Sequence, residues 1–141
     1  MKGKLLVIGQ FATIALLLFG GAWHLPIWAW MLFALGLAVF AAAAFSLGNN
    51  NFTIMPDPRA GNTLSQRGIY RMVRHPMYTS VLLCGSAVAF GAPSVVRWVA
   101  LAVCVVVLVL KVRYEEGLLT QRHPEYKQRM AGTYRLVPGI W

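Results

Sequence analysis

One stretch of the sequence, residues 5–56, contains no Asp, Glu, Lys or Arg. A helix needs about 20 apolar residues to cross a bilayer, so this stretch is long enough for two passes. A chain of 141 residues forms at most one domain. A soluble domain of this size has no core that could bury so long a run. We therefore predict an all-α, multi-pass integral membrane protein.

Glycine, proline and asparagine residues divide the apolar sequence into segments. Pro76 suits the first position of a helix, where its missing N–H would have no partner. The last apolar segment is short, so Arg97 and Lys111 are expected to snorkel toward the headgroups. The predicted elements of this single domain are four transmembrane helices at residues 5–22, 27–47, 76–92 and 94–113, a cofactor-binding loop at 48–75, and a C-terminal segment at 115–141 that contains an amphipathic helix.

The positive charge of the chain, a net +9, predicts its orientation. With four passes, the N-terminus, the 48–75 loop and the chain from Lys111 onward share one side and hold every Lys and Arg except Arg97. Lys and Arg accumulate on the cytoplasmic side of membrane proteins. Both termini and the loop are therefore predicted to face the cytoplasm, across the inner or plasma membrane if the source is bacterial. This explains the charge better than nucleic-acid binding, which we do not expect.

The cysteines and histidines do not suggest a metal site. Cys84 and Cys104 lie inside apolar segments and are predicted to be packing residues. His24, His75 and His123 lie on different segments. Neither set has the spacing of a zinc site, and we predict no metal.

A polar cluster surrounds the predicted start of the third helix. Arg74 and His75 precede Pro76, where free N–H groups and the positive end of the helix dipole favour an anion. Tyr78 lies three residues after His75 and can face the same way. Together with Tyr70, these side chains predict a site for a carboxylate or phosphate. The alternative is a basic anchor at the membrane border.

A second cluster, Glu115-Glu116, is expected directly after the fourth helix. Ionisable groups near a membrane are candidates for function and usually have a cationic partner. The alternative is a local salt bridge to Lys111 or Arg113. Both clusters are predicted on one side of the membrane, and together they suit the amino-acid moiety of a zwitterionic ligand.

The two clusters also carry a resemblance to a known family. Gly68-x-Tyr70-x-x-x-Arg74-His75-Pro76-x-Tyr78, followed later by Glu115-Glu116-x-x-Leu119, resembles the isoprenylcysteine carboxyl methyltransferase and phospholipid methyltransferase superfamily. The match extends over about residues 49–139. It implies an S-adenosylmethionine-dependent methyltransferase that acts on a lipophilic substrate entering from the bilayer.

The resemblance and the polar clusters together assign roles to particular residues. The position four before the first acid contacts substrate in the prenylcysteine enzymes, and it is Lys111 here. His75 and Tyr78 are candidates for a catalytic base, which a carboxylate acceptor would not need. The predicted cofactor-binding residues are Asn62, Thr63, Leu64, Ser65, Tyr70, Arg74, His75, Pro76, Met77, Tyr78, Glu115 and Glu116.

Other readings stay open at this stage. The chain could be a non-enzymatic four-helix membrane protein or small transporter, although its acids are predicted outside the spans. It could also be an NADPH-dependent membrane reductase of related layout. The methyl acceptor could be an isoprenylcysteine-type carboxylate, a lipid amine or a small hydrophobic molecule. The sequence does not tell whether the protein forms a homo-oligomer.

Overall fold

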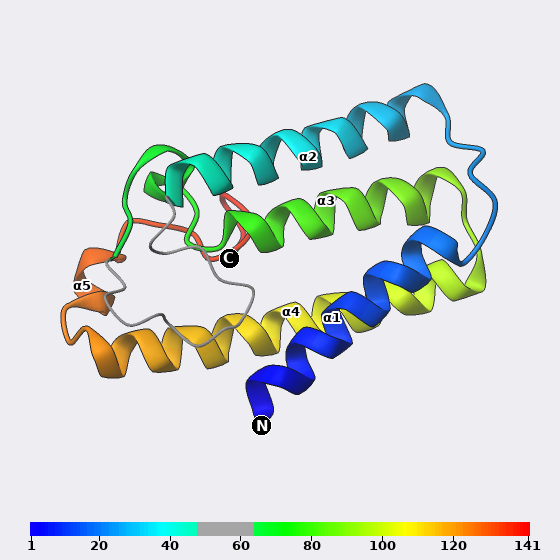
Figure 1. The fold of residues 1–141 in the computed structure, drawn as a ribbon. Coiled ribbons are helices and arrows are strands. Elements are labelled where there is room, and N and C mark those ends of the chain that lie inside the picture. Colours follow the sequence, from blue (N-terminus) through cyan, green and yellow to red (C-terminus); the bar gives the residue numbers. More distant parts are fainter. Residues whose placement is uncertain (48–63) are drawn as a thin grey trace.

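A computed structural model describes residues 1–47 and 64–141, and this part of the chain is helical with no β-strand (Figure 1). The predicted all-α class is therefore confirmed. The elements are α1 (Lys2–Phe19), α2 (Ile27–Leu47), the short 3₁₀ helix η1 (Gly68–Arg71), α3 (Pro76–Gly91), α4 (Val95–Arg122) and α5 (Tyr126–Arg129).

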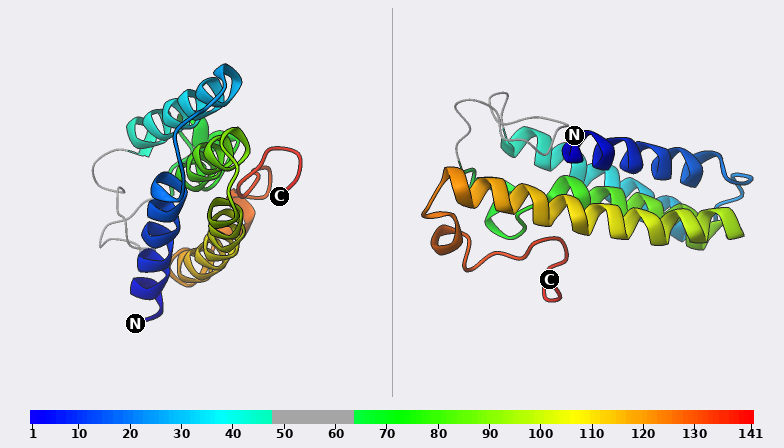
Figure 2. Two further views of the ribbon diagram at one scale, coloured as in Figure 1. Left: turned by 90° about the vertical axis from the view of Figure 1, so that its right-hand side faces the viewer. Right: turned by 90° about the horizontal axis from the view of Figure 1, so that it is seen from below.

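The four long helices lie side by side in two pairs (Figures 1 and 2). α2 packs mainly on α3, and α1 packs mainly on α4, while α3 also contacts α1 and α4. Gly36 allows the close approach of α2 to α3, because a Cβ there would lie 3.1 Å from the carbonyl oxygen of Ser80. Small residues permit such backbone contact between helices in membranes.

Three of these helices, α1, α2 and α4, are long and apolar enough to cross a membrane. α3 is also apolar but has 16 residues, a length of about 24 Å at 1.5 Å per residue. That is shorter than the hydrocarbon layer, which is about 30 Å thick. The structure thus supports a membrane protein with three candidate spans, and the fourth pass stays a prediction.

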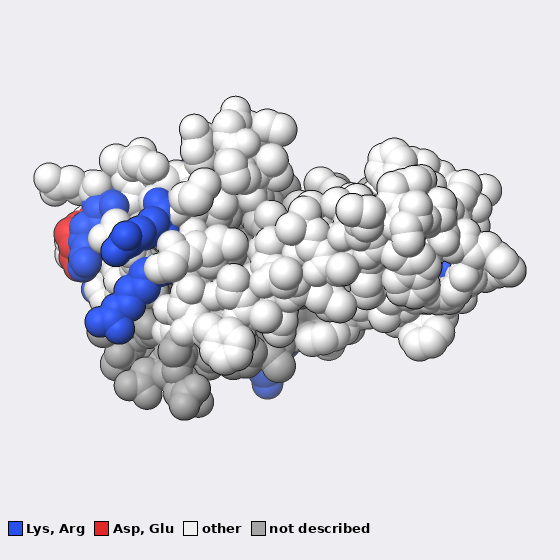
Figure 3. All heavy atoms as spheres, turned by 90° about the horizontal axis from the view of Figure 1, so that it is seen from above, with Lys and Arg blue, Asp and Glu red and all other residues white. Residues whose placement is uncertain are grey.

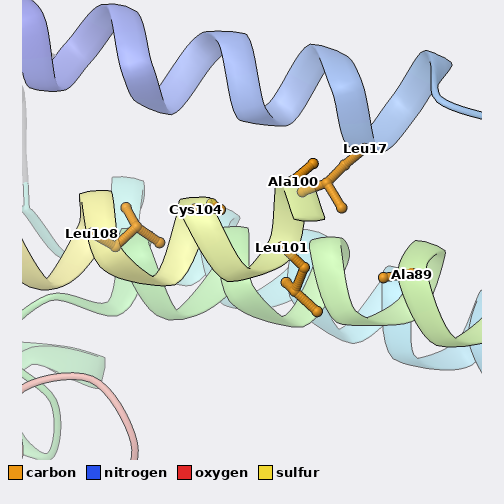
Figure 4. Close-up of a cluster of buried hydrophobic side chains, with 6 residues drawn as sticks. All are labelled: Leu17, Ala89, Ala100, Leu101, Cys104 and Leu108. Atoms are coloured by element: carbon orange, nitrogen blue, oxygen red, sulfur yellow. The ribbon is translucent and has the colours of Figure 1, made fainter. Parts of the chain in front are cut away.

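A buried cluster joins α1, α3 and α4 (Figure 4). Leu17 of α1 contacts the α4 stripe formed by Ala100, Leu101, Cys104 and Leu108, and Ala89 of α3 completes the cluster. The α4 members recur at intervals of three or four residues, so they share one helix face. Cys104 therefore has the packing role that the sequence predicted.

Arg97 is buried at the end of the bundle where α1 and α3 finish. Its side chain is 1% exposed and donates hydrogen bonds to the carbonyl oxygens of Leu17, Gly21, Ala22 and Ala92. These carbonyls belong to the C-terminal ends of α1 and α3, where helix dipoles favour a cation. The prediction that Arg97 snorkels to the headgroups is wrong, because the protein's own backbone satisfies its guanidinium.

α4 is longer than predicted and continues past residue 113 to Arg122. Glu115 and Glu116 therefore lie within this helix rather than after it. The sequence from Tyr114 to Arg122 contains no proline, and the first proline is Pro124. The charged residues from Arg113 onward mark the point where α4 leaves apolar surroundings, and the helix itself continues. The helical part predicted after residue 115 is divided in the structure: residues 115–122 continue α4, and α5 follows after Pro124.

The other bounds differ less. α1 begins at Lys2 and ends at Phe19 rather than covering residues 5–22, while α2 and α3 lie close to their predicted ranges. Charged atoms gather at the α5 end of the face drawn in Figure 3, and most of the rest of that face is uncharged. The C-terminal segment lies at the same end as α5 (Figure 1).

Candidate functional site

The candidate site begins at the start of α3, which the C-terminal segment holds in place. The backbone N–H of Arg74 donates to the carbonyl of Tyr134 at 2.8 Å, and that of His75 donates to the carbonyl of Arg135 at 3.0 Å. Pro76 then occupies the first turn of α3, as its missing N–H favours. These bonds fix the backbone from which the site side chains project.

Glu116 of α4 is the centre of an ion-pair network. Its Oε1 lies 3.2 Å from Arg74 Nη1 and 3.5 Å from His75 Nε2, and its Oε2 accepts from Arg135 Nε at 2.9 Å. The hydroxyl of Tyr126 also donates to Oε1, at 3.4 Å. The carboxylate is 12% exposed. Glu116 therefore ties α4 to the start of α3 and to the C-terminal segment.

Arg74 is committed to this network. Besides Glu116, its guanidinium donates to Thr133 Oγ1 at 2.9 Å and to the carbonyl of Met130 at 2.6 Å. The sequence predicted Arg74 as part of an anion site for a ligand, but the anion that it binds here is the protein's own Glu116. The alternative of a salt bridge to Lys111 or Arg113 does not form at Glu116, whose described arginine partners are Arg74 and Arg135.

Glu115 is more accessible than its neighbour. Its side chain is 26% exposed, and its Oε2 accepts a hydrogen bond from the Tyr78 hydroxyl at 2.8 Å. His75 Nδ1 lies 3.7 Å from the same oxygen. The imidazole stacks on the Tyr78 ring, with centroids 5.5 Å apart and planes 6° apart. The Glu115 carboxylate is thus held in a fixed orientation and can accept further hydrogen bonds.

His75 lies between the two glutamates and is itself buried. Its Nε2 is the one buried side-chain nitrogen or oxygen without a hydrogen-bond partner in the described part of the chain. Such atoms are rare because an unpaired buried polar group is costly. An unpaired nitrogen beside a partly exposed carboxylate is what a ligand-binding site leaves free.

Lys111 is fully buried on the same side of the bundle, so the prediction that it snorkels is also wrong. Its Nζ donates to Gln10 Oε1 and lies 4.8 Å from the centroid of the Tyr78 ring. Gln10, on α1, was missed by the sequence reasoning. The signal was present, because Gln10 is a side-chain amide inside an otherwise apolar helix, and such groups are costly in a membrane.

Two buried phenols complete the polar surroundings. Burial raises the pKa of Tyr70 well above its ordinary value, and the charge of Glu115 raises it further. Burial also raises the pKa of Tyr126, with Glu116 adding to the effect. Both phenols therefore stay protonated at neutral pH and can act only as donors toward the carboxylates or as neutral acceptors.

The remaining predicted residues fall into three groups. Pro76 is buried in the first turn of α3, where Met77 is half-buried. Leu64 and Ser65 are half-buried, and the Ser65 hydroxyl donates to the carbonyl of Ser46 at 3.4 Å. Asn62 and Thr63 lie outside the described residues.

The structure thus brings together Arg74, His75, Tyr78, Lys111, Glu115 and Glu116, with Tyr70 close enough to Glu115 to be influenced by its charge.

The arrangement suits the binding of an organic cation or hydroxyl groups rather than a metal. The described residues contain no group of three His, Cys, Asp or Glu that could hold a metal ion. A partly exposed carboxylate, a buried imidazole and a buried ammonium lie around one tyrosine ring. These groups can bind and orient a polar ligand of mixed charge.

Comparison with known families matches residues 25–129 to the phospholipid methyltransferase family. The match includes α3 and α4, with both polar clusters of the candidate site. It leaves out the whole of α1, including Gln10. No curated protein sequence matches the chain.

Proposed function

The chain belongs to the phospholipid methyltransferase family, and from this premise we propose that it transfers a methyl group from S-adenosylmethionine to a lipophilic acceptor reached from the bilayer. Membership in this family implies methyltransferase activity in a membrane setting. The family match does not name the methyl donor or the methyl acceptor. Both are proposed here from the geometry of the site.

The observation that carries the proposal is an accessible carboxylate, Glu115, held beside the buried imidazole of His75 at the start of α3. Glu115 is 26% exposed and held by Tyr78, and His75 Nε2 has no hydrogen-bond partner among the described residues. The methionyl ammonium and the ribose hydroxyls of S-adenosylmethionine need acceptors, and its carboxylate needs a donor. Glu115 suits the first requirement, so the residues present fit the ammonium and hydroxyl groups of this ligand.

The bound donor would supply a methyl group activated on a sulfonium sulfur. The chain's own residues orient the reactants, and orientation can contribute about 7–11 kcal/mol to such reactions. The Arg74–Glu116–Arg135 network keeps the start of α3 against α4. That contact holds His75 and Tyr78 beside Glu115.

Lys111 is assigned to the acceptor side. Its ammonium is buried next to the Tyr78 ring, whereas Glu115 is 26% exposed. The Tyr78 hydroxyl donates a hydrogen bond to Glu115. His75 is therefore the better candidate for taking a proton from an uncharged methyl acceptor. An anionic acceptor would need no base.

We further place the site on the cytoplasmic side of the membrane. The support is the distribution of Lys and Arg, all of which except Arg97 lie in the N-terminus, the 48–75 segment or the region from Lys111 onward. The structure adds that Arg97 is buried and bonded to backbone carbonyls. It therefore does not count as a positive charge in an external loop.

The test is calorimetric titration of S-adenosylmethionine into the protein purified in detergent. Glu115→Gln should weaken binding about tenfold or more, because hydrogen bonds to charged groups contribute about 1.5–3 kcal/mol. Glu125→Gln is the matched control, since Glu125 is 46% exposed and pairs with His123 outside the site. Binding of NADPH in place of S-adenosylmethionine would overturn the proposal in favour of a reductase. Equal affinity in both variants would remove Glu115 from the site.

A further inference from the structure

Four exposed cationic side chains lie on two segments at the α5 end of the bundle, where charged atoms gather in Figure 3. Arg67 precedes η1 and Arg71 ends it, while Lys127 and Arg129 belong to α5. The side chain of Gln66 joins the two segments, because its Nε2 donates to the carbonyl of Arg129 at 2.7 Å. These four cations, which we call the basic rim, therefore belong to one region of the surface.

The acidic residues that the structure describes do not neutralise the basic rim. Glu115 and Glu116 pair with residues of the candidate site, and Glu125 Oε1 lies 3.7 Å from His123 Nδ1. The fourth acid, Asp57, lies outside the described residues. In the part of the chain that the structure describes, no carboxylate forms an ion pair with any of the four cations. This positive charge therefore suits an anion from outside the protein.

The basic rim lies where a candidate membrane span ends. η1 packs on α2, and the Ser65 hydroxyl donates to the carbonyl of Ser46 at 3.4 Å, close to the end of α2 at Leu47. α2 is long and apolar enough to cross a membrane, so its end marks the level of the lipid headgroups. Clusters of Lys and Arg beside the end of a span are typical of surfaces that bind anionic phospholipids.

α5 connects this surface to the candidate site. Tyr126 and Met130 lie four residues apart and are both buried, while the two cations of α5 are exposed. On the buried side, the Tyr126 hydroxyl donates to Glu116 Oε1 at 3.4 Å, and the carbonyl of Met130 accepts from Arg74 Nη2 at 2.6 Å. One helical turn is not stable by itself in water, so α5 depends on the contacts made by its two sides. A contact that holds the exposed side also holds the buried side against Glu116 and Arg74.

We propose that the basic rim binds the phosphate groups of anionic phospholipids in the adjoining leaflet, and that this binding keeps α5 in contact with the ion-pair network of the candidate site. The membrane is the partner that the position favours, because lipid headgroups surround the end of a span. A nucleic acid would have to approach a membrane surface that is itself negatively charged. The consequence for methyl transfer rests on the proposed function, whereas lipid binding and the hold on α5 do not.

The test follows amide hydrogen exchange in the full-length protein reconstituted in nanodiscs. One set of nanodiscs contains phosphatidylcholine alone, and the other contains phosphatidylcholine mixed with phosphatidylglycerol. The readout is exchange at Arg74 and His75, whose N–H groups donate to Tyr134 and Arg135 in the segment that follows α5. Attraction to an anionic surface raises the binding equilibrium about fivefold per Lys or Arg, so exchange should be at least about fivefold slower in the anionic nanodiscs.

Lys127→Gln/Arg129→Gln should remove the difference between the two kinds of nanodisc, because both substitutions take charge from the exposed side of α5. Lys2→Gln/Lys4→Gln is the matched control, since it takes the same charge from exposed positions of α1 and leaves the basic rim intact. The control should keep the difference that the wild type shows.

The η1 part of the basic rim is tested by counting bound lipids. Native mass spectrometry should show fewer retained phosphatidylglycerol molecules for Arg67→Gln/Arg71→Gln than for the Lys2→Gln/Lys4→Gln control. Equal numbers in these two variants would overturn the basic rim as a lipid-binding surface.

Other outcomes would also overturn the proposal. Exchange at Arg74 and His75 could be the same in both kinds of nanodisc, or the α1 control could lose the difference as well. Equal slowing by inorganic phosphate or by duplex RNA, added to phosphatidylcholine nanodiscs, would assign the surface to a soluble anion or a nucleic acid instead. Faster exchange of Lys127→Gln/Arg129→Gln in phosphatidylcholine alone would show that these side chains hold α5 by contacts within the protein.

These measurements are independent of the proposed function. None of them contains S-adenosylmethionine, so a failure of the protein to bind that ligand would overturn the proposed function and leave the lipid-binding surface in place. Normal S-adenosylmethionine binding together with equal exchange in both kinds of nanodisc would have the opposite meaning.

Discussion

Two arginines are held in different ways at the two ends of the helical bundle. Arg97 is 1% exposed and donates to four backbone carbonyls at the ends of α1 and α3. Arg74 donates to one carbonyl, one hydroxyl and the carboxylate of Glu116. The guanidinium of the first arginine donates to backbone carbonyls, and that of the second belongs to a network of side chains.

The difference separates a structural end from a functional end. Backbone carbonyls cannot change their protonation or move independently, so the Arg97 end has one arrangement. The Glu116 end instead contains titratable groups in contact with one another, an accessible carboxylate at Glu115 and an unpaired nitrogen on His75. Clusters of interacting titratable groups in partly buried positions are typical of functional sites.

The largest effect should come from Arg97→Met. Removing the guanidinium leaves four carbonyls, one buried and three partly buried, without their donor, and an unsatisfied buried group costs about 1–3 kcal/mol. We expect the free energy of unfolding to fall by more than about 3 kcal/mol, measured by denaturant titration in detergent micelles. Arg113→Met removes the same charge from an exposed position of α4 and should have little effect. A similar fall in both variants would show that the carbonyl contacts contribute nothing.

A smaller effect is expected at the opposite end for Glu116→Gln. The change removes the negative charge that pairs with Arg74 and Arg135, at a cost of about 1.5–3 kcal/mol. The C-terminal segment should then separate more often from α3. Amide hydrogen exchange at Arg74 and His75 reports this directly, because their N–H groups donate to Tyr134 and Arg135.

The neighbouring carboxylate provides the control for that experiment. Glu115→Gln keeps Glu116 and its two arginines intact, so exchange at Arg74 and His75 should stay at the wild-type rate. Faster exchange in Glu115→Gln alone would reverse the roles assigned to the two glutamates. Unchanged exchange in both variants would show that backbone hydrogen bonds hold the segment without the ion pairs.

The sequence predicted those features that depend on local signals. The uncharged run and its Gly and Pro breaks predicted the bounds of α2 and the start of α3 at Pro76. The end of α4 was misplaced because Glu115 and Glu116 were taken to lie beyond the helix, although nothing there breaks it. The Arg74–Glu116 and Gln10–Lys111 contacts join residues 42 and 101 positions apart. Such pairings depend on how helices pack, which no local spacing reveals.

The smallest effect should come from Gln10→Leu, which tests whether α1 contributes to the functional end. Lys111 would keep its position over the Tyr78 ring but lose the carboxamide oxygen that orients its ammonium. We expect kcat/KM for methyl transfer to fall about tenfold, which corresponds to about 1.4 kcal/mol of transition-state stabilisation. S-adenosylmethionine affinity should be unchanged, because the Gln10 carboxamide bonds to Lys111 and lies on a different helix from Glu115 and His75. Transfer is measured with radiolabelled methyl donor and a membrane lipid extract.

Thr13→Val is the matched control for this change. Thr13 is buried on the same helix, and its hydroxyl donates to the carbonyl of Gln10 at 2.8 Å. The two variants remove a polar group at similar depth, but only Gln10→Leu alters the surroundings of the Lys111 ammonium. Gln10→Glu, which keeps an acceptor oxygen, should retain more activity than Gln10→Leu. An equal loss of transfer in Gln10→Leu and Thr13→Val would mean that α1 supports the fold alone, and that the functional end is built by α3, α4 and the C-terminal segment without it.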